Sequence, residues 1–212
     1  GPMGNPQFLF YAVLTGLFPR LLAVGILLIP VVRNYADHEL AEAAAAKTIR
    51  WFWGHLLSAL GFGVGVAAAV LIVVHLAGSS HHFWAHFGLV LLAVGGGAQM
   101  FGLGADGIGP LAIRQAGGSA KLFFDGSRFW VTGTFIAGSI LFSLGQIIMV
   151  ILIGNREIFL PGMSIAMLVA AILFSVSTAV PSGYGLYLTA VTALVIYLPL
   201  AGHFWQLARL SS

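Results

Sequence analysis

Charged side chains are concentrated in one short stretch of an otherwise apolar chain. Five of the charged residues lie between positions 106 and 128: Asp106, Arg114, Lys121, Asp125 and Arg128. Two neighbouring carboxylates could serve as a general acid and base, but we expect the nearby cations to keep both ionised and paired, whereas a general acid needs a proton. We therefore interpret this cluster as a solvated loop that orients the protein, and not as a catalytic site.

Histidine is the second residue type that could support chemistry, as a ligand of haem or of a metal. His81, His82 and His86 form an H-H-x₃-H run, in which His82 and His86 would share a helix face. His55 and His203 each lie beside tryptophan, a residue typical of the membrane interface. We interpret all five as interface residues, so that no metal or cofactor is expected, and a haem or metal membrane enzyme stays a less favoured alternative.

Recognisable catalytic motifs are absent from the sequence. It contains no G-x-S-x-G elbow, no H-E-x-x-H pair, no phosphate-binding loop and no pair of carboxylates within an apolar segment. We therefore expect a protein that is not an enzyme.

The composition predicts which solvent surrounds these residues. The 212 residues are 59% hydrophobic and 7% charged, with a mean hydropathy of +1.01. A soluble protein of this size could not bury so much apolar surface, so the chain must lie in lipid. The few basic residues are scattered singly, which argues against a nucleic-acid partner.

Six apolar stretches are long enough to cross a bilayer as helices, which need about 20 residues. They cover residues 8–32, 52–77, 83–104, 129–153, 158–180 and 183–206. The sequence thus predicts an all-α, polytopic membrane helix bundle with six transmembrane helices in a single domain, 1–212. Pro19 and Arg20 interrupt the first stretch, and the segment "GADGIGPLAI" predicts an irregular or re-entrant end after the third.

Basic residues set the expected orientation. The loops after the odd-numbered stretches hold six of them, and the opposite side holds two: Arg33, Lys47, Arg50, Arg114, Lys121 and Arg128 against Arg156 and Arg209. This split predicts cytoplasmic odd-numbered loops and both termini outside. A cysteine-free composition rich in alanine, glycine and valine further suggests the inner membrane of a bacterium.

The loop at 33–50 has a composition typical of a short helix. It is rich in alanine, and Asp37 precedes the first helix-forming residues, where a side-chain carboxylate can cap a helix. We predict a short solvated or interfacial helix that joins the first two spans.

Polar groups within the spans are candidates for ligand contacts. Arg20 lies near the middle of the first span, where a charge is costly, so either it reaches the interface or it faces a ligand or the bundle interior. Gln99 and Gln146 should each find a partner or line a cavity, and helix–helix contact is the simpler alternative. Gly61 and Gly65 form a G-x-x-x-G spacing that predicts close helix packing, within one chain or in a homo-oligomer.

The segment "SAKLFFD", Ser119 to Asp125, resembles the segment that leads into the fourth span of the Insig family, and "WQLARL" at 205–210 resembles the end of its last span. The resemblance implies six spans, a sterol or other lipid bound between helices, and partner membrane proteins.

Our leading hypothesis is therefore an integral membrane protein that binds a diacyl lipid or a sterol in an intramembrane cavity. The candidate binding residues are Arg20, Gln99, Gln146, Lys121 and Asp125. The alternative is a small-molecule transporter or channel, gated by the glycine-rich end of the third span.

Overall fold

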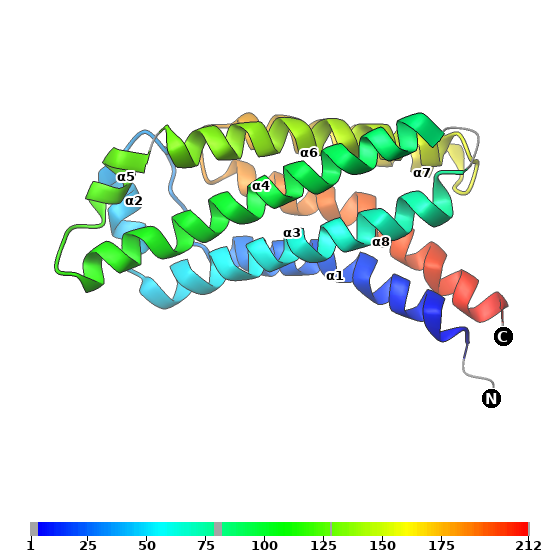
Figure 1. Ribbon diagram of the computed structural model, residues 1–212, viewed down its shortest axis with the longest axis horizontal. Coiled ribbons are helices and arrows are strands. Elements are labelled where there is room, and N and C mark those ends of the chain that lie inside the picture. Colours follow the sequence, from blue (N-terminus) through cyan, green and yellow to red (C-terminus); the bar gives the residue numbers. More distant parts are fainter. Residues whose placement is uncertain (1–3, 79–81, 128, 212) are drawn as a thin grey trace.

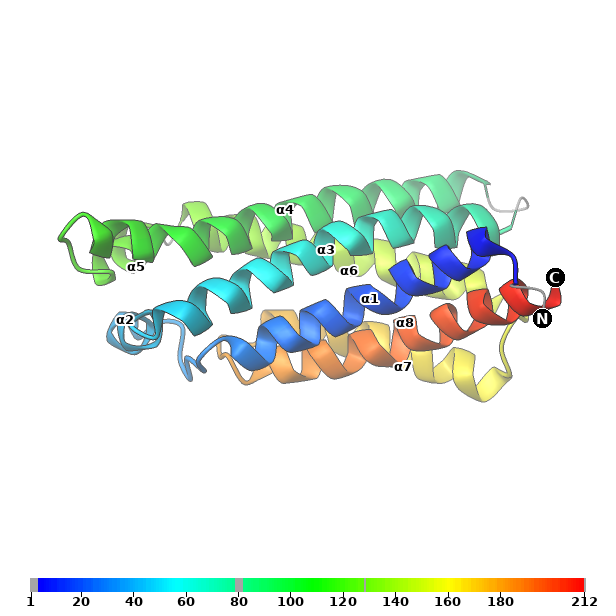
Figure 2. The ribbon, with the colours of Figure 1, turned by 90° about the horizontal axis from the view of Figure 1, so that it is seen from below.

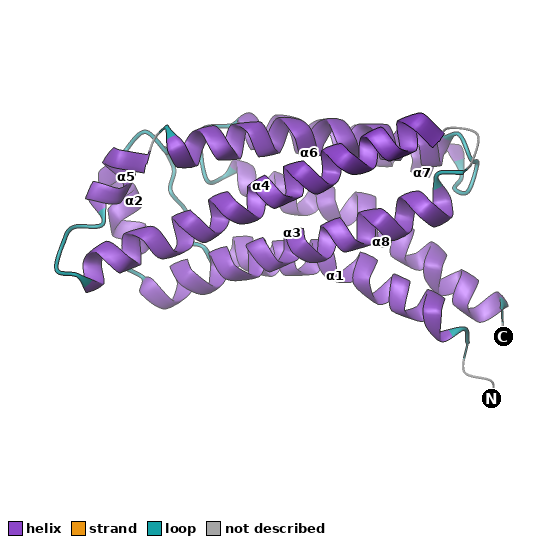
Figure 3. Cartoon of the chain, viewed as in Figure 1, coloured by secondary structure: helices purple, strands orange, loops and turns teal. Residues whose placement is uncertain are grey.

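The computed structural model describes residues 4–78, 82–127 and 129–211, and every regular element among them is an α-helix (Figures 1 and 3). The helices are α1 (Pro6–Leu28), α2 (His38–Ala45), α3 (Thr48–Leu76), α4 (His82–Gln115), α5 (Lys121–Ser127), α6 (Trp130–Gly154), α7 (Pro161–Ala179) and α8 (Gly185–Leu210).

Six of these helices, all except α2 and α5, are long and apolar enough to cross a membrane, which confirms the prediction of a six-span bundle. They run side by side, and the short helices α2 and α5 lie together at one end (Figures 1 and 2). The two termini lie at the opposite end, as an even number of spans requires. We call these the α2 end and the terminal end. The sidedness of the bundle in its membrane stays a prediction.

Aromatic rings fill the centre of the bundle. Phe18 of α1, Phe142 of α6 and Tyr197 of α8 are almost completely buried. The ring of Phe18 lies 4.8 Å from that of Tyr197 and 6.2 Å from that of Phe142, measured between centroids. These contacts join helices that are distant in the sequence, and they place Phe18 level with Phe142, the midpoint of α6.

Glycines let pairs of spans approach until backbones nearly touch. Gly61 of α3 lies against the backbone of α1, where an added Cβ would be 3.2 Å from the nitrogen of Leu22. Gly95 of α4 is tighter still, because an added Cβ would lie 2.3 Å from the nitrogen of Phe142 in α6. The predicted close packing at Gly61 is thus confirmed within one chain.

Two expected interruptions are absent. The helix α1 continues through Pro19, and α4 continues through Pro110 to Gln115, so the prediction of an irregular or re-entrant end after residue 104 was wrong. Pro110 has no N–H and leaves the carbonyl of Asp106, four residues earlier, without its helical donor. The indole N–H of Trp51 donates to this carbonyl at 2.9 Å, and this bond explains how the helix tolerates the proline.

The helix predicted in the loop at 33–50 is present as α2. The carboxylate of Asp37 accepts hydrogen bonds from the backbone N–H groups of Glu39 and Leu40, at 3.1 and 3.2 Å. This is the capping geometry that the sequence predicts. The helix packs against α5.

Candidate functional site

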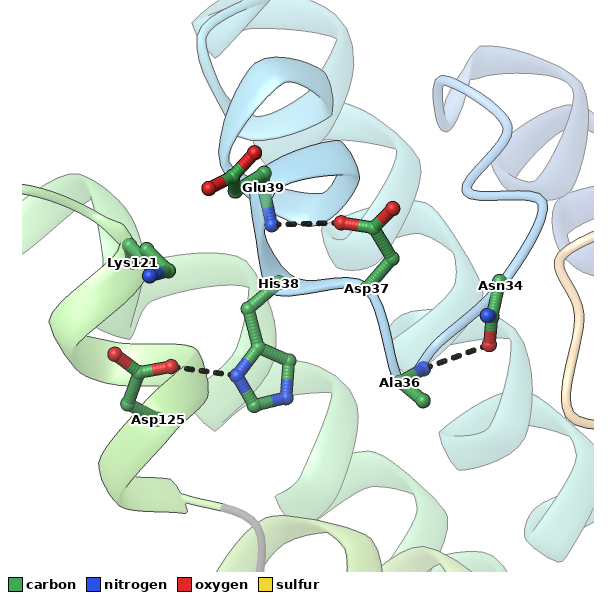
Figure 4. Close-up of a pocket in the computed structure, with 7 residues that line it drawn as sticks. All are labelled: Asn34, Ala36, Asp37, His38, Glu39, Lys121 and Asp125. Carbon is green, nitrogen blue, oxygen red and sulfur yellow. Dashed lines mark hydrogen bonds and ion pairs between the residues drawn. The ribbon is translucent and has the colours of Figure 1, made fainter.

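An open pocket of about 460 Å³ lies between α2 and α5 (Figure 4). Its lining is polar and contains two of the predicted binding residues, Lys121 and Asp125. The full lining is Asn34, Ala36, Asp37, His38, Glu39, Lys121 and Asp125. The structure therefore brings Lys121 and Asp125 together, one turn apart on α5.

The two carboxylates of the charged cluster have partners other than those expected. Asp125 binds the ring nitrogen Nδ1 of His38 at 2.6 Å (Figure 4), and Asp106 binds Nε2 of His55 at 3.2 Å. Among the described residues, neither carboxylate forms an ion pair with arginine or lysine, whereas Arg128 lies outside the described residues. His38 comes close to Asp125 because α2 packs against α5, and His55 comes close to Asp106 because α3 packs against α4. The local sequence does not indicate either pairing.

The Asp106 contact belongs to a closed network between α3 and α4. Nδ1 of His55 donates to the carbonyl oxygen of Trp51 at 2.6 Å, because a carbonyl can only accept. Trp51 in turn donates to the backbone of Asp106, and Gly107 leaves room for the imidazole. With Nδ1 protonated, the contact between Nε2 and the carboxylate needs one further proton between them. The pair is thus either imidazolium with carboxylate or imidazole with carboxylic acid.

A second pocket, of about 270 Å³, lies where α1 ends and α3 begins. Its charged lining residues are all basic: Arg33, Lys47 and Arg50. The remaining lining is apolar: Pro30, Val31, Leu40, Ala43 and Ala44. Arg50 is held in place by a hydrogen bond of 3.0 Å from its Nε to the carbonyl of Leu28. We call this the basic pocket.

From the sequence, Arg33, Lys47 and Arg50 are interpreted only as residues that set the orientation in the membrane, and no pocket is predicted from them. One signal was available, since Lys47 and Arg50 are three positions apart at the start of α3 and so share a face. The fold adds Arg33 from the preceding loop, and this placement depends on the turn between α1 and α2.

Gln99 and Gln146 lie in the interior of the bundle, away from both pockets. The amide of Gln99 donates to Ser139 Oγ at 2.7 Å and to the carbonyl of Phe135 at 3.3 Å, which joins α4 to α6. Gln146 accepts a hydrogen bond of 2.7 Å from the Tyr197 hydroxyl, while its buried amide nitrogen has no partner. The predicted partners exist, and the contacts are those of helices packed on one another.

Arg20 occupies a different environment from the other candidates. Its side chain is exposed on the outer face of α1, and its guanidinium lies over Gly16 next to Ala201 of α8. It lines neither of the two pockets.

The histidine run is described only in part. His81 lies outside the described residues, whereas the rings of His82 and His86 lie 5.6 Å apart, which confirms that they share a helix face. Among the described residues, no group of three histidine, cysteine or acidic side chains could hold a metal ion.

Comparisons with protein-family models, with curated proteins and with solved structures gave no match. The fold and the site therefore define the class of this protein: it is a polytopic, α-helical integral membrane protein with a polar assembly at one end of its bundle.

Proposed function

We propose that this membrane protein binds a diacyl phospholipid, and that the basic pocket holds its phosphate. The observation that carries this proposal is the convergence of Arg33, Lys47 and Arg50 on one pocket with no acidic residue in its lining. Arginine and lysine are the side chains best suited to phosphate oxygens. A sterol has no phosphate and would leave the three charges unused.

The depth of the basic pocket suits a lipid headgroup. Pro30 and Val31 follow the end of α1, and Lys47 and Arg50 begin α3, so the pocket lies where two spans reach the membrane surface. Trp53, half-exposed one turn further along α3, is a residue type that prefers this interface. A phosphate in the pocket would leave the acyl chains to lie along the apolar outer faces of α1 and α3.

The size of the expected effect follows from the charges. A basic residue near an anionic membrane surface contributes about 1 kcal/mol, so three contribute about 3 kcal/mol, or roughly 100-fold in affinity. Selectivity should therefore depend on the headgroup more than on the tails.

Native mass spectrometry of the purified protein, titrated with phosphatidylglycerol or with diacylglycerol of the same tails, tests this proposal. We expect stoichiometric binding of phosphatidylglycerol and weak binding of diacylglycerol. The triple variant Arg33→Gln, Lys47→Gln, Arg50→Gln should lose the preference for the phospholipid.

A control variant with the same change of net charge distinguishes binding in the basic pocket from nonspecific electrostatic attraction between the protein and the lipid. The triple variant Arg114→Gln, Lys121→Gln, Arg128→Gln removes three cations from the loop after the third span, which is predicted to lie on the same side of the membrane, and should keep the preference. Equal losses in both triple variants would show that net charge, and not the pocket, selects the lipid. A loss confined to the control variant would move the site to the pocket between α2 and α5.

A further inference from the structure

Arg20 lies on the outer face of α1 at the middle of the bundle. It follows Phe18 by two residues, and Phe18 is level with the midpoint of α6. Leu28, at the nearer end of α1, is eight residues away, which corresponds to about 12 Å along the helix axis. The guanidinium is directed further inward, because its Nη1 lies 3.3 Å from the position that a Cβ on Gly16 would occupy.

Within 4–78, 82–127 and 129–211, no residue balances this charge. Arg20 forms no hydrogen bond or ion pair among the described residues. The acidic residues of the sequence lie towards the ends of the bundle: Asp37, Glu39, Glu42, Asp106 and Asp125 near the α2 end, and Glu157 near the terminal end. A basic side chain at this depth is costly without a partner, by about 2.5–3.5 kcal/mol on insertion scales.

A lipid headgroup is a poor partner for this position. Headgroups lie about 15 Å from the midplane of a bilayer. Helical side chains point towards the N-terminus of their helix, and in α1 this direction leads Arg20 away from the nearer surface and towards the centre.

A second copy of the chain is also a poor partner. In a symmetric pair formed through α1, Arg20 would face the same residue of the other copy, and like charges repel. The exposed residues beside it on α1 are Val13, Val24 and Leu27, so the same surface offers no carboxylate in return.

We propose that the outer face of α1 around Arg20 docks a transmembrane helix of a partner protein that carries an aspartate or glutamate at mid-membrane depth. The apolar residues Val13, Val24 and Leu27 form the rest of the contact. Beneath the guanidinium, the buried Gly16 lets α1 pack closely against Ala201 of α8, so that the charge lies over this helix contact. An ion pair at this depth removes two costly charges from lipid at once.

A synthetic polyleucine helix with one central aspartate serves as the probe. The full chain and the labelled helix are reconstituted in phosphatidylcholine vesicles, and energy transfer between them reports association. We expect the aspartate helix to bind the wild-type protein about 10-fold more tightly than an all-leucine helix. Arg20→Gln should abolish that preference. Because both helices are compared in vesicles of the same lipid, the basic pocket is in the same state in both measurements and cannot account for a difference between them.

Charge exchange provides the second measurement. The Arg20→Glu variant should instead prefer a polyleucine helix with a central arginine, which a folding defect could not produce. Moving the aspartate of the probe seven residues towards one end should remove its advantage over leucine. The proposal is overturned if the aspartate helix binds no better than leucine, or if its preference survives Arg20→Gln. It is also overturned if wild-type chains associate with one another through this face instead.

Discussion

The indole N–H of Trp51 lies 2.9 Å from the carbonyl oxygen of Asp106, the carbonyl that Pro110 deprives of its helical donor. A side chain of α3 thus supplies the missing hydrogen-bond donor to the backbone of α4, at the same residue, Asp106, whose carboxylate binds His55. This carbonyl is partly buried, so this one bond links the continuity of a helix to the packing of its neighbour.

This relationship predicts a coupling between positions 51 and 110. Trp51→Phe should lower the free energy of unfolding by about 1–3 kcal/mol, because it leaves a partly buried carbonyl without a donor. In the Pro110→Ala background the helix regains its own N–H, so the same change should cost about 1 kcal/mol less. Unfolding in mixed micelles measures all four proteins. Trp53→Phe, at a half-exposed position, is the matched control, and equal costs in both backgrounds would refute the coupling.

The proton shared between His55 and Asp106 predicts which replacements are tolerated. Asp106→Asn can donate from its amide to Nε2 of a neutral imidazole and should change the free energy of unfolding by less than about 1 kcal/mol. Asp106→Leu leaves a buried ring nitrogen without a partner and should cost about 1–3 kcal/mol. The same pair of replacements at Asp125, whose side chain is half-exposed, should differ little. If Asp106→Asn is as damaging as Asp106→Leu, the pair is a fixed ion pair.

The sequence predicts the spanning helices well because each is a local property: its length and apolar content suffice for 83–104 and for 129–153. The sequence-based prediction fails where a residue distant in the sequence supplies an interaction that the local segment lacks. From the sequence alone, Pro110 indicates a broken helix. The helix is continuous because Trp51, 59 positions earlier, donates a hydrogen bond to the carbonyl that the proline leaves free. The basic pocket could not be predicted from the sequence for the same reason, because Arg33 comes close to Lys47 and Arg50 only through the turn between α1 and α2.

The contact between α4 and α6 predicts opposite outcomes for two neighbouring glycines. Gly95→Ala would place its Cβ 2.3 Å from the Phe142 nitrogen, so the helices must separate, at a cost of about 1–3 kcal/mol. Gly97 has nothing within 4 Å of an added Cβ, and Gly97→Ala should leave stability unchanged or raise it by up to about 1 kcal/mol. Thermal unfolding in detergent compares the two variants, and a similar loss in both would contradict this packing.

The phenol of Tyr35, in the loop between α1 and α2, leads to a prediction of how the stability of the protein changes at high pH. Partial burial of its side chain, which is 45% exposed, and then the negative charge of Asp106 raise the pKa of its phenol from about 10 to about 12. The folded protein therefore favours the neutral phenol, and the resulting stability is complete below pH 10 and is lost as the pH rises through 12. The phenolate absorbance of the wild type minus that of Tyr35→Phe, titrated in detergent, should give a midpoint of about 12. Asp106→Asn should lower this pKa but keep it above 10, because burial remains, while Asp125→Asn should leave it unchanged. A midpoint of 10 in the wild type would place Tyr35 in open water, away from Asp106.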